Sequence, residues 1–394
     1  MRQTIYAVAI TIATGLASCD IANNEVEPGV SFTKIYDDQS YGVEYDPLAL
    51  VSTEDGGYLG LAAVDNWNAY LFKTDLDGNF VWEIRIDDAY VSPLAELILI
   101  DGEYHLFCMN EVTLATVAMR INLAERTATP IAELNEVQYP LAITKTNDES
   151  LLVLGYDRKS RSSTLHAFRT DFSIVWSNQY AVEEDVEEDI IHHISRTGKQ
   201  LPFLVGTMQD GQSYFFNGYA NYTLGLNFVQ LQNGDLVGAM NGFRDEGFIS
   251  AVHHLQGNQF ALARSSFGVN SLIPNAEVNP TAITASSELV ANDFPEIDRG
   301  ARVVVHEVMH KGQPVIVFGT HTNKRQLVLF AYDKISGELR GVQYLGQSSP
   351  YQLGDFVGTD DGGLAVLSET FLVGRFSRPC LFKLSAEEVD NFFQ

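Results

Sequence analysis

The chain has 394 residues, with 25 Lys and Arg against 51 Asp and Glu, which gives a formal net charge of −26. At 45% hydrophobic and 19% charged residues it is too apolar for disorder, and its acidity disfavours nucleic-acid phosphates as partners. Three cysteines are too few for a disulfide framework, so we expect a fold that does not depend on one.

Residues 1–18 predict a secretory signal peptide. Arg2 supplies the positive start, and residues 5–16 form an apolar run that is too short to span a bilayer. The run ends in Leu-Ala-Ser followed by Cys19, which resembles the lipobox of bacterial lipoproteins. This resemblance implies cleavage before Cys19 and lipidation of Cys19, so that acyl chains attach the mature chain to a membrane.

The segment 19–29 is polar and acidic, and it predicts a flexible tether ahead of a single domain at 30–394. Within that domain, short alternating hydrophobic runs separated by Gly, Asp and Asn predict β-strands. The clearest unit has Asp-Gly and Gly-Asn turns, which suit tight hairpins. Its four expected strands are residues 48–53, 58–64, 69–74 and 80–86.

The turn between the first and second strands recurs at intervals of 46 to 59 residues. It is found at Gly56, Gly102, Asp148, Gly198, Gly257, Gly312 and Gly362. A four-stranded unit repeated at roughly this interval is typical of a β-propeller. We therefore expect an all-β fold, a β-propeller with seven four-stranded blades. Six or eight blades, or two stacked β-sandwiches, remain alternatives, because residues 220–250 and 266–300 fit the repeat poorly.

The last unit provides only three expected strands before a short helical segment at 385–388. Residues 30–38 resemble the fourth strand of the first unit, residues 80–88. We therefore expect residues 30–38 to complete the last blade and close the ring, which would leave no free sheet edge.

Two repeat motifs carry a family resemblance. The pattern DGGY, KTD, GN and Trp82 within residues 55–82 resembles repeats of bacterial secreted and lipid-anchored propellers. Residues 331–339 (AYDKISGEL) are similar to the blade motif of the quinoprotein-like superfamily, which includes dehydrogenases and a scaffolding lipoprotein of outer-membrane barrel assembly. The chain has only three Trp and no sign of a quinone pocket, so we expect no cofactor.

Three histidines are candidate metal ligands. His192, His253 and His306 fall on the expected first strands of consecutive units, and counting back from the turns gives them the same parity. First strands line a propeller channel, so the three could share a cation; histidines that are only hydrogen-bonded are the alternative.

A formal HExxH motif spans His306 to His310. It follows three valines and precedes another β run, so we expect it on a strand, where residues four apart lie about 13 Å from each other. Such a pair cannot share one zinc ion, and we do not expect a metalloprotease.

Two further features complete the sequence-based expectations. Residues 183–189 (EEDVEED) predict a solvated acidic loop, which could instead meet a basic partner. Cys108 and Cys380 fall on expected strands and should be buried free thiols.

Together these features predict an outer-membrane lipoprotein that faces the periplasm or the cell surface. We expect a binding or scaffolding accessory subunit of an outer-membrane protein complex, held in the membrane through Cys19. A glycan or a divalent cation is left open as a further ligand. The alternative function is an extracellular carbohydrate-active enzyme with carboxylates at the channel mouth.

Overall fold

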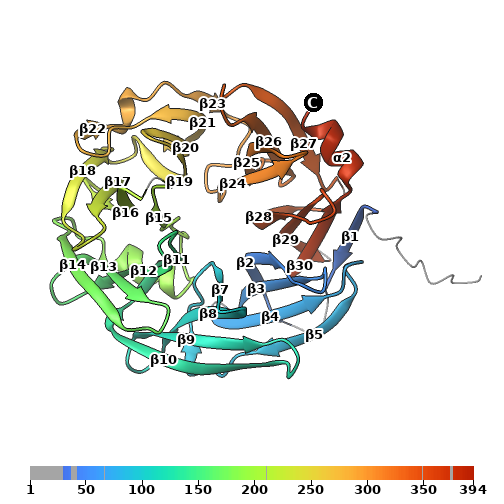
Figure 1. Cartoon of the computed structure of the whole chain (residues 1–394), viewed down its shortest axis with the longest axis horizontal. Coiled ribbons are helices and arrows are strands. Elements are labelled where there is room, and N and C mark those ends of the chain that lie inside the picture. Colours follow the sequence, from blue (N-terminus) through green and yellow to red (C-terminus); the bar gives the residue numbers. More distant parts are fainter. Residues whose placement is uncertain (1–29, 37–41, 66, 210, 348, 373–375) are drawn as a thin grey trace, which may run out of the picture.

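The computed structural model describes residues 30–36, 42–65, 67–209, 211–347, 349–372 and 376–394. The all-β expectation is confirmed: antiparallel sheets follow one another around a central axis, as Figure 1 shows. Most consecutive strands pair antiparallel in a meander, and the first strand of each meander lies innermost.

The first two groups of strands belong to one extended sheet, because the short strand β6 (Tyr90–Val91) pairs with both. The first group is β2 (Tyr45–Ser52), β3 (Tyr58–Val64), β4 (Asn68–Thr74) and β5 (Phe80–Arg85). The second is β7 (Leu97–Ile100), β8 (Glu103–Asn110), β9 (Ala115–Asn122) and β10 (Thr127–Gln138).

The middle of the chain forms three further groups. The third is β11 (Pro140–Lys145), β12 (Ser150–Asp157), β13 (Ser162–Arg169) and β14 (Ile174–Ala181), followed by helix α1 (Glu187–Ile194). The fourth is β15 (Val205–Thr207), β16 (Ser213–Ala220), β17 (Thr223–Gln230) and β18 (Leu236–Asn241). The next is β19 (Phe248–Gln256), β20 (Gln259–Ser266), β21 (Val269–Glu277) and β23 (Asn292–Phe294).

Two groups end the chain. They are β24 (Val304–His310), β25 (Gln313–His321), β26 (Leu327–Asp333) and β27 (Leu339–Leu345), and then β28 (Tyr351–Gly358), β29 (Leu364–Leu372) and β30 (Phe376–Leu384). Strand β1 (Phe32–Ile35) pairs antiparallel with β30, with Phe32 opposite Lys383. Helix α2 (Ala386–Phe392) follows β30.

Two stretches that fit the repeat poorly have physical explanations. The strand-like run after residue 234 is β18, the outer strand of its group. The irregular region at 266–300 contains β21 and β23 of one group, the 3-10 helix η1 (Ser286–Glu288), and β22 (Ile283–Ala285), which pairs in parallel with β18 of the neighbouring sheet. Because β22 pairs with a neighbouring sheet, the connection between β21 and β23 is long, and the repeat is difficult to recognise in this part of the sequence.

The core lies between neighbouring sheets. Phe72, Phe107, Phe228 and Phe330 are at most 1% exposed, and burial of each such ring contributes roughly 2–3 kcal/mol. Residues of the first group, such as Tyr70, pack against β29 and β30, so the two ends of the described chain meet in one hydrophobic cluster. The aromatic content therefore serves mainly to join the sheets.

The DGGY motif forms a polar lock around the buried Lys73 side chain, at the turn between the two inner strands. Asp55 accepts hydrogen bonds from the Gly57 N–H at 3.1 Å and from the Lys73 ammonium at 2.9 Å, and Lys73 also donates to the Thr74 carbonyl at 2.6 Å. A Cβ on Gly57 would lie 2.1 Å from that carbonyl oxygen, so only glycine fits. The motif is thus explained by local geometry.

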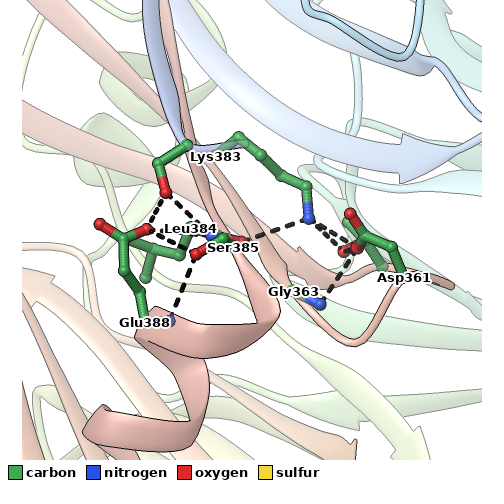
Figure 2. Close-up of polar contacts among 8 residues, drawn as sticks. Asp361, Gly363, Lys383, Leu384, Ser385 and Glu388 are labelled. Carbon is green, nitrogen blue, oxygen red and sulfur yellow. Dashed lines mark hydrogen bonds and ion pairs between the residues drawn. The ribbon is translucent and has the colours of Figure 1, made fainter. Parts of the chain in front are cut away.

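The last group repeats this lock, as Figure 2 shows. Lys383 donates to Asp361 at 2.7 Å, to the Thr359 hydroxyl at 2.6 Å and to the Leu384 carbonyl at 3.2 Å. Burial works to raise the pKa of Asp361, but the hydrogen bonds from Lys383, Thr359 and Gly363 outweigh it and hold that pKa below its usual value.

A capping box joins the N-terminal strand to helix α2. The Glu388 N–H donates to the Ser385 hydroxyl at 3.3 Å, and the Ser385 N–H donates to the Glu388 carboxylate at 3.0 Å (Figure 2). The Ser385 N–H also donates to the Ser31 hydroxyl at 3.1 Å, just before β1. The start and end of the described chain are therefore held together by polar contacts as well as by strand pairing.

Candidate functional site

A cavity of about 1150 Å³ opens at one end of the central channel, and we call it the mouth cavity. Its walls include the beginnings of the inner strands β2, β11, β19, β24 and β28 and the hairpin turns that lie at the same end. Because these segments come from all around the ring, the cavity lies on its axis.

Helix α1 and the chain after it, to residue 204, form part of the cavity wall. The Ser92 hydroxyl donates to the Ile194 carbonyl, and Arg196 forms an ion pair with Asp46 of β2. The segment between β14 and β15 therefore reaches across the channel to the first two groups of strands.

This segment corrects two expectations. The turn predicted at Gly198 is wrong, since the inner strand of this group is β15 and the next turn follows Met208. The acidic run 183–189 is only partly a loop, because α1 begins at Glu187. A helical signal was present: Val186, Ile190 and Ile194 are buried at a spacing of four, and the acidic residues precede the histidines, as the helix dipole favours.

The three candidate metal ligands are not brought together. His192 lies on α1 rather than on a first strand, whereas His253 is on β19 and His306 is on β24, as expected. His306 pairs with Asp355 at 2.8 Å, and His253 lies 3.5 Å from Glu307. Among the described residues, no three His, Cys, Asp or Glu side chains form a group that could hold a metal ion.

The HExxH motif lies on strand β24, as its sequence context predicted. His310 pairs with Asp390 of α2 at 2.7 Å, whereas His306 pairs with Asp355 of β28. Glu307 accepts a hydrogen bond from Lys334 at 2.7 Å. These partners account for all three polar side chains of the motif structurally.

Cationic side chains line the mouth cavity, although the chain as a whole is strongly acidic. We call them the basic cluster: Arg196, Lys199, Arg244, Arg299 and Arg302. They come from the connections that precede the inner strands of three groups, and sequence patterns alone gave no reason to group them. Charged groups in a concave wall focus the local potential, so this end of the channel attracts anions.

Arg302, two residues before β24, differs from Arg196 in the partners of its guanidinium. Its backbone carbonyl accepts from the Thr320 hydroxyl at 2.9 Å, but across the described part of the chain no side chain or carbonyl hydrogen-bonds or ion-pairs with its guanidinium. Burial lowers the pKa of Arg302, and the nearby Arg196 adds to this, against the opposing influence of Asp355 and Asp46.

The basic cluster also affects His193 on α1. Burial, followed by the charges of Arg196 and Arg302, lowers the pKa of His193 to about 3, so this imidazole is neutral at physiological pH. Its Nδ1 accepts a hydrogen bond from the Leu201 N–H at 3.1 Å. His193 therefore positions the segment after α1 and adds no charge to the cavity.

Acidic residues in the wall offset the basic cluster only in part. They are Asp46, Asp189, Asp245 and Glu369. Burial, with Asp46 and Glu44 nearby, raises the pKa of Glu369 to about 8, so this carboxyl is mostly protonated near pH 7. The Gln352 side chain donates a hydrogen bond to it.

Exposed aromatic side chains lie beside the cavity, and we call Tyr222, Phe243 and Phe267 the aromatic rim. They are 60%, 59% and 70% exposed. Their loops are joined, because the Arg244 N–H donates to the Asn221 carbonyl at 2.8 Å and the Phe267 N–H donates to the Asp245 carbonyl at 2.7 Å. Clustered exposed aromatics of this kind mark interaction surfaces.

Two of these aromatics occupy unfavourable backbone positions. Tyr222 has φ of 61° and Phe267 has φ of 50°, each in a two-residue hairpin loop whose usual occupants are Asn and Gly. A bulky residue in the left-handed region costs roughly 1–2 kcal/mol. The sequence thus places large apolar side chains at the rim at a local cost in stability.

Other sequence-based expectations fall outside the cavity. Cys19 lies outside the described residues, as do residues 37 and 38 of the expected closing segment. Cys108 and Cys380 are buried free thiols, as expected, and burial raises the pKa of each to about 12. In the described ranges, no helix has the length and apolar character needed to cross a membrane.

Comparison with known proteins gives a match in structure only. No protein-family model and no curated protein matches the sequence. The WD40 domain of Toxoplasma gondii coronin is 12% identical, with a TM-score of 0.51, and the alignment covers 90% of this chain and 86% of that one. For a hydrazine synthase chain of Kuenenia stuttgartiensis the identity is 9% and the TM-score 0.53, covering 89% and 99%.

A chain of a mitotic checkpoint complex is also similar, at 10% identity and a TM-score of 0.50, with 98% of each chain covered. At these identities the likeness concerns the fold alone. The chain is an all-β protein with β-propeller neighbours, and its function has to be argued from its own surface.

Proposed function

We propose that this chain is a seven-bladed β-propeller, residues 30–394, which β1 closes by completing the blade of β28, β29 and β30. The successive groups of strands and the pairing of Phe32 with Lys383 support this proposal. The lipobox-like sequence supports a signal peptide at 1–18 and a lipid anchor at Cys19, followed by a tether at 19–29.

The function that the surface supports best is binding. We propose that the chain acts as an accessory or scaffolding subunit of an outer-membrane protein complex, facing the periplasm or the cell surface. The observation that carries this proposal is the aromatic rim: three exposed aromatic side chains on interlocked loops, two of them held at positive φ. Aromatic residues dominate the binding energy of many protein interfaces.

The test is retention of a partner by a tagged chain purified from detergent-solubilised envelopes. A triple variant, Tyr222→Ser, Phe243→Ser and Phe267→Ser, removes the aromatic rim. A matched control replaces Phe80, Ile174 and Leu339 by serine, because these side chains are 50%, 41% and 51% exposed on outer strands.

Wild type and control should retain the same membrane protein in stoichiometric amount, and the rim variant should lose it. A monomer without a partner, or a rim variant that keeps its partner, would contradict the proposal.

A second candidate is an extracellular carbohydrate-active enzyme. Glu369 and Asp46 both line the mouth cavity, and burial together with Asp46 raises the pKa of Glu369 to about 8, as suits a general acid. Polysaccharide hydrolysis by wild type that is abolished in Glu369→Gln would favour this function over binding. Hydrolysis at background level in both wild type and Glu369→Gln would exclude the enzyme function.

A further inference from the structure

We propose that the mouth cavity binds an acidic peptide segment, one carboxylate of which pairs with Arg302. This inference rests on the proposed function as a protein-binding subunit, and it names the chemistry of the segment that the partner would insert.

The guanidinium of Arg302 is the first argument. It lines the cavity, and within the described ranges it has no hydrogen-bond or ion-pair partner, whereas Arg196 beside it is paired with Asp46. Arg302 is partly buried, so its guanidinium keeps part of its contact with water and remains available to a ligand in the cavity. A ligand carboxylate would satisfy it with two parallel hydrogen bonds.

The surroundings of Arg302 are the second argument. Lys199 and Arg244 lie over the rings of Phe248 and Phe243, at 5.1 and 5.4 Å, and no described residue forms an ion pair with either of them. Of the acidic residues in the wall, Asp46 is already engaged by Arg196. The high pKa of Glu369 further reduces the negative charge at the mouth near pH 7. A chain of net charge −26 thus presents a cationic cavity.

The shape and the walls favour a peptide over a smaller or more hydrophilic ligand. A cavity of about 1150 Å³ is far larger than a single carboxylate needs. Apolar residues make up much of the wall, among them Leu48, Leu94, Leu141, Phe203, Val303 and Leu353. Such walls suit the side chains of a peptide, whereas a polyhydroxylated sugar would leave hydroxyl groups unpaired there.

The experiment uses the domain of residues 30–394 with its native sequence, and a phage library of random dodecapeptides. Selection on wild type should enrich Asp and Glu, and the affinity of synthetic versions of the selected peptides is then measured by fluorescence anisotropy. Arg302→Met should weaken binding at least about 10-fold, as loss of a charge-assisted bidentate pair implies. Arg120→Met, at a half-exposed arginine outside the cavity, should change it less than about 2-fold.

Arg302→Lys keeps the positive charge but lacks the planar guanidinium, so it should give an intermediate loss of peptide affinity. It replaces Arg302→Met as the test variant if that variant does not fold. Selection without enrichment of acidic residues, or equal affinity of wild type and Arg302→Met, would overturn the inference. Binding of tetragalacturonate but of no peptide would also overturn it, in favour of an acidic glycan. If the Arg302→Met variant still captures its partner through the aromatic rim, the proposed binding function stands and only the peptide site at Arg302 is refuted.

Discussion

Replacement of Lys383 by methionine tests the lock between the inner strands of the last sheet. The Lys383 side chain is 2% exposed and donates to Asp361, Thr359 and the Leu384 carbonyl, whereas Asp361 is 30% exposed. Removing one partner of a buried ion pair typically costs about 3–5 kcal/mol. Asp361 keeps some contact with water and the hydrogen bond from the Gly363 N–H, so we expect a smaller cost, about 2–3 kcal/mol.

The assay is urea unfolding at pH 7, with Lys311→Met as the control. Lys311 pairs with Asp390 at 2.8 Å but is 68% exposed, so its loss should cost less than about 1 kcal/mol. Because the folded-state pKa of Asp361 is lowered, its contribution is present above its ordinary value near 3.8 and is lost as the pH falls through the folded pKa. The difference between wild type and Lys383→Met should therefore shrink in acid. Equal costs at Lys383 and Lys311 would refute the reasoning.

Three further expectations concern single residues. The pKa of Glu369 is raised to about 8 in the folded chain, so its contribution to stability is complete below pH 4.5 and is lost as the pH rises through 8. Between pH 5 and 9 the free energy of unfolding, measured with urea, should therefore fall less in Glu369→Gln than in wild type, by on the order of 2 kcal/mol. Tyr222→Gly should raise stability by about 1 kcal/mol, because it relieves a φ of 61°, while weakening partner capture; lower stability would contradict this. Gly363→Ala should cost more than about 2 kcal/mol, because a Cβ would lie 2.3 Å from the Leu384 carbonyl oxygen, whereas Gly300→Ala, in open surroundings, should be near neutral in the same unfolding assay.

The hairpins were predictable because their turns carry local information. Asp55 and the glycines after it specify the turn, and the alternating residues on either side specify the strands. The same logic placed the HExxH motif on β24. It failed after β14, where Val186, Ile190 and Ile194 follow a helical spacing that the expectation of another repeat concealed. That one error displaced His192 from the strand on which it was expected.

The mouth cavity could not be predicted from the sequence. Its five cations come from three separate connections, and only the folded arrangement of the sheets brings them to one end of the channel. Nothing in the neighbours of Arg302 along the chain indicates that its guanidinium lines the cavity without a partner among the residues that the structure describes. The aromatic rim is similar, since Tyr222 and Phe267 look like ordinary hydrophobic residues until their turns and exposure are known.

The most direct test of the binding proposal is site-specific photo-crosslinking in intact cells. A photoreactive residue at position 267 lies on the aromatic rim, and one at position 335 lies in the turn between β26 and β27, at the end of the ring opposite the cavity; Phe267 and Ile335 are 70% and 79% exposed. The account predicts one specific protein adduct from position 267 and none from position 335. An adduct from position 335 alone, or equal adducts from both positions, would contradict it.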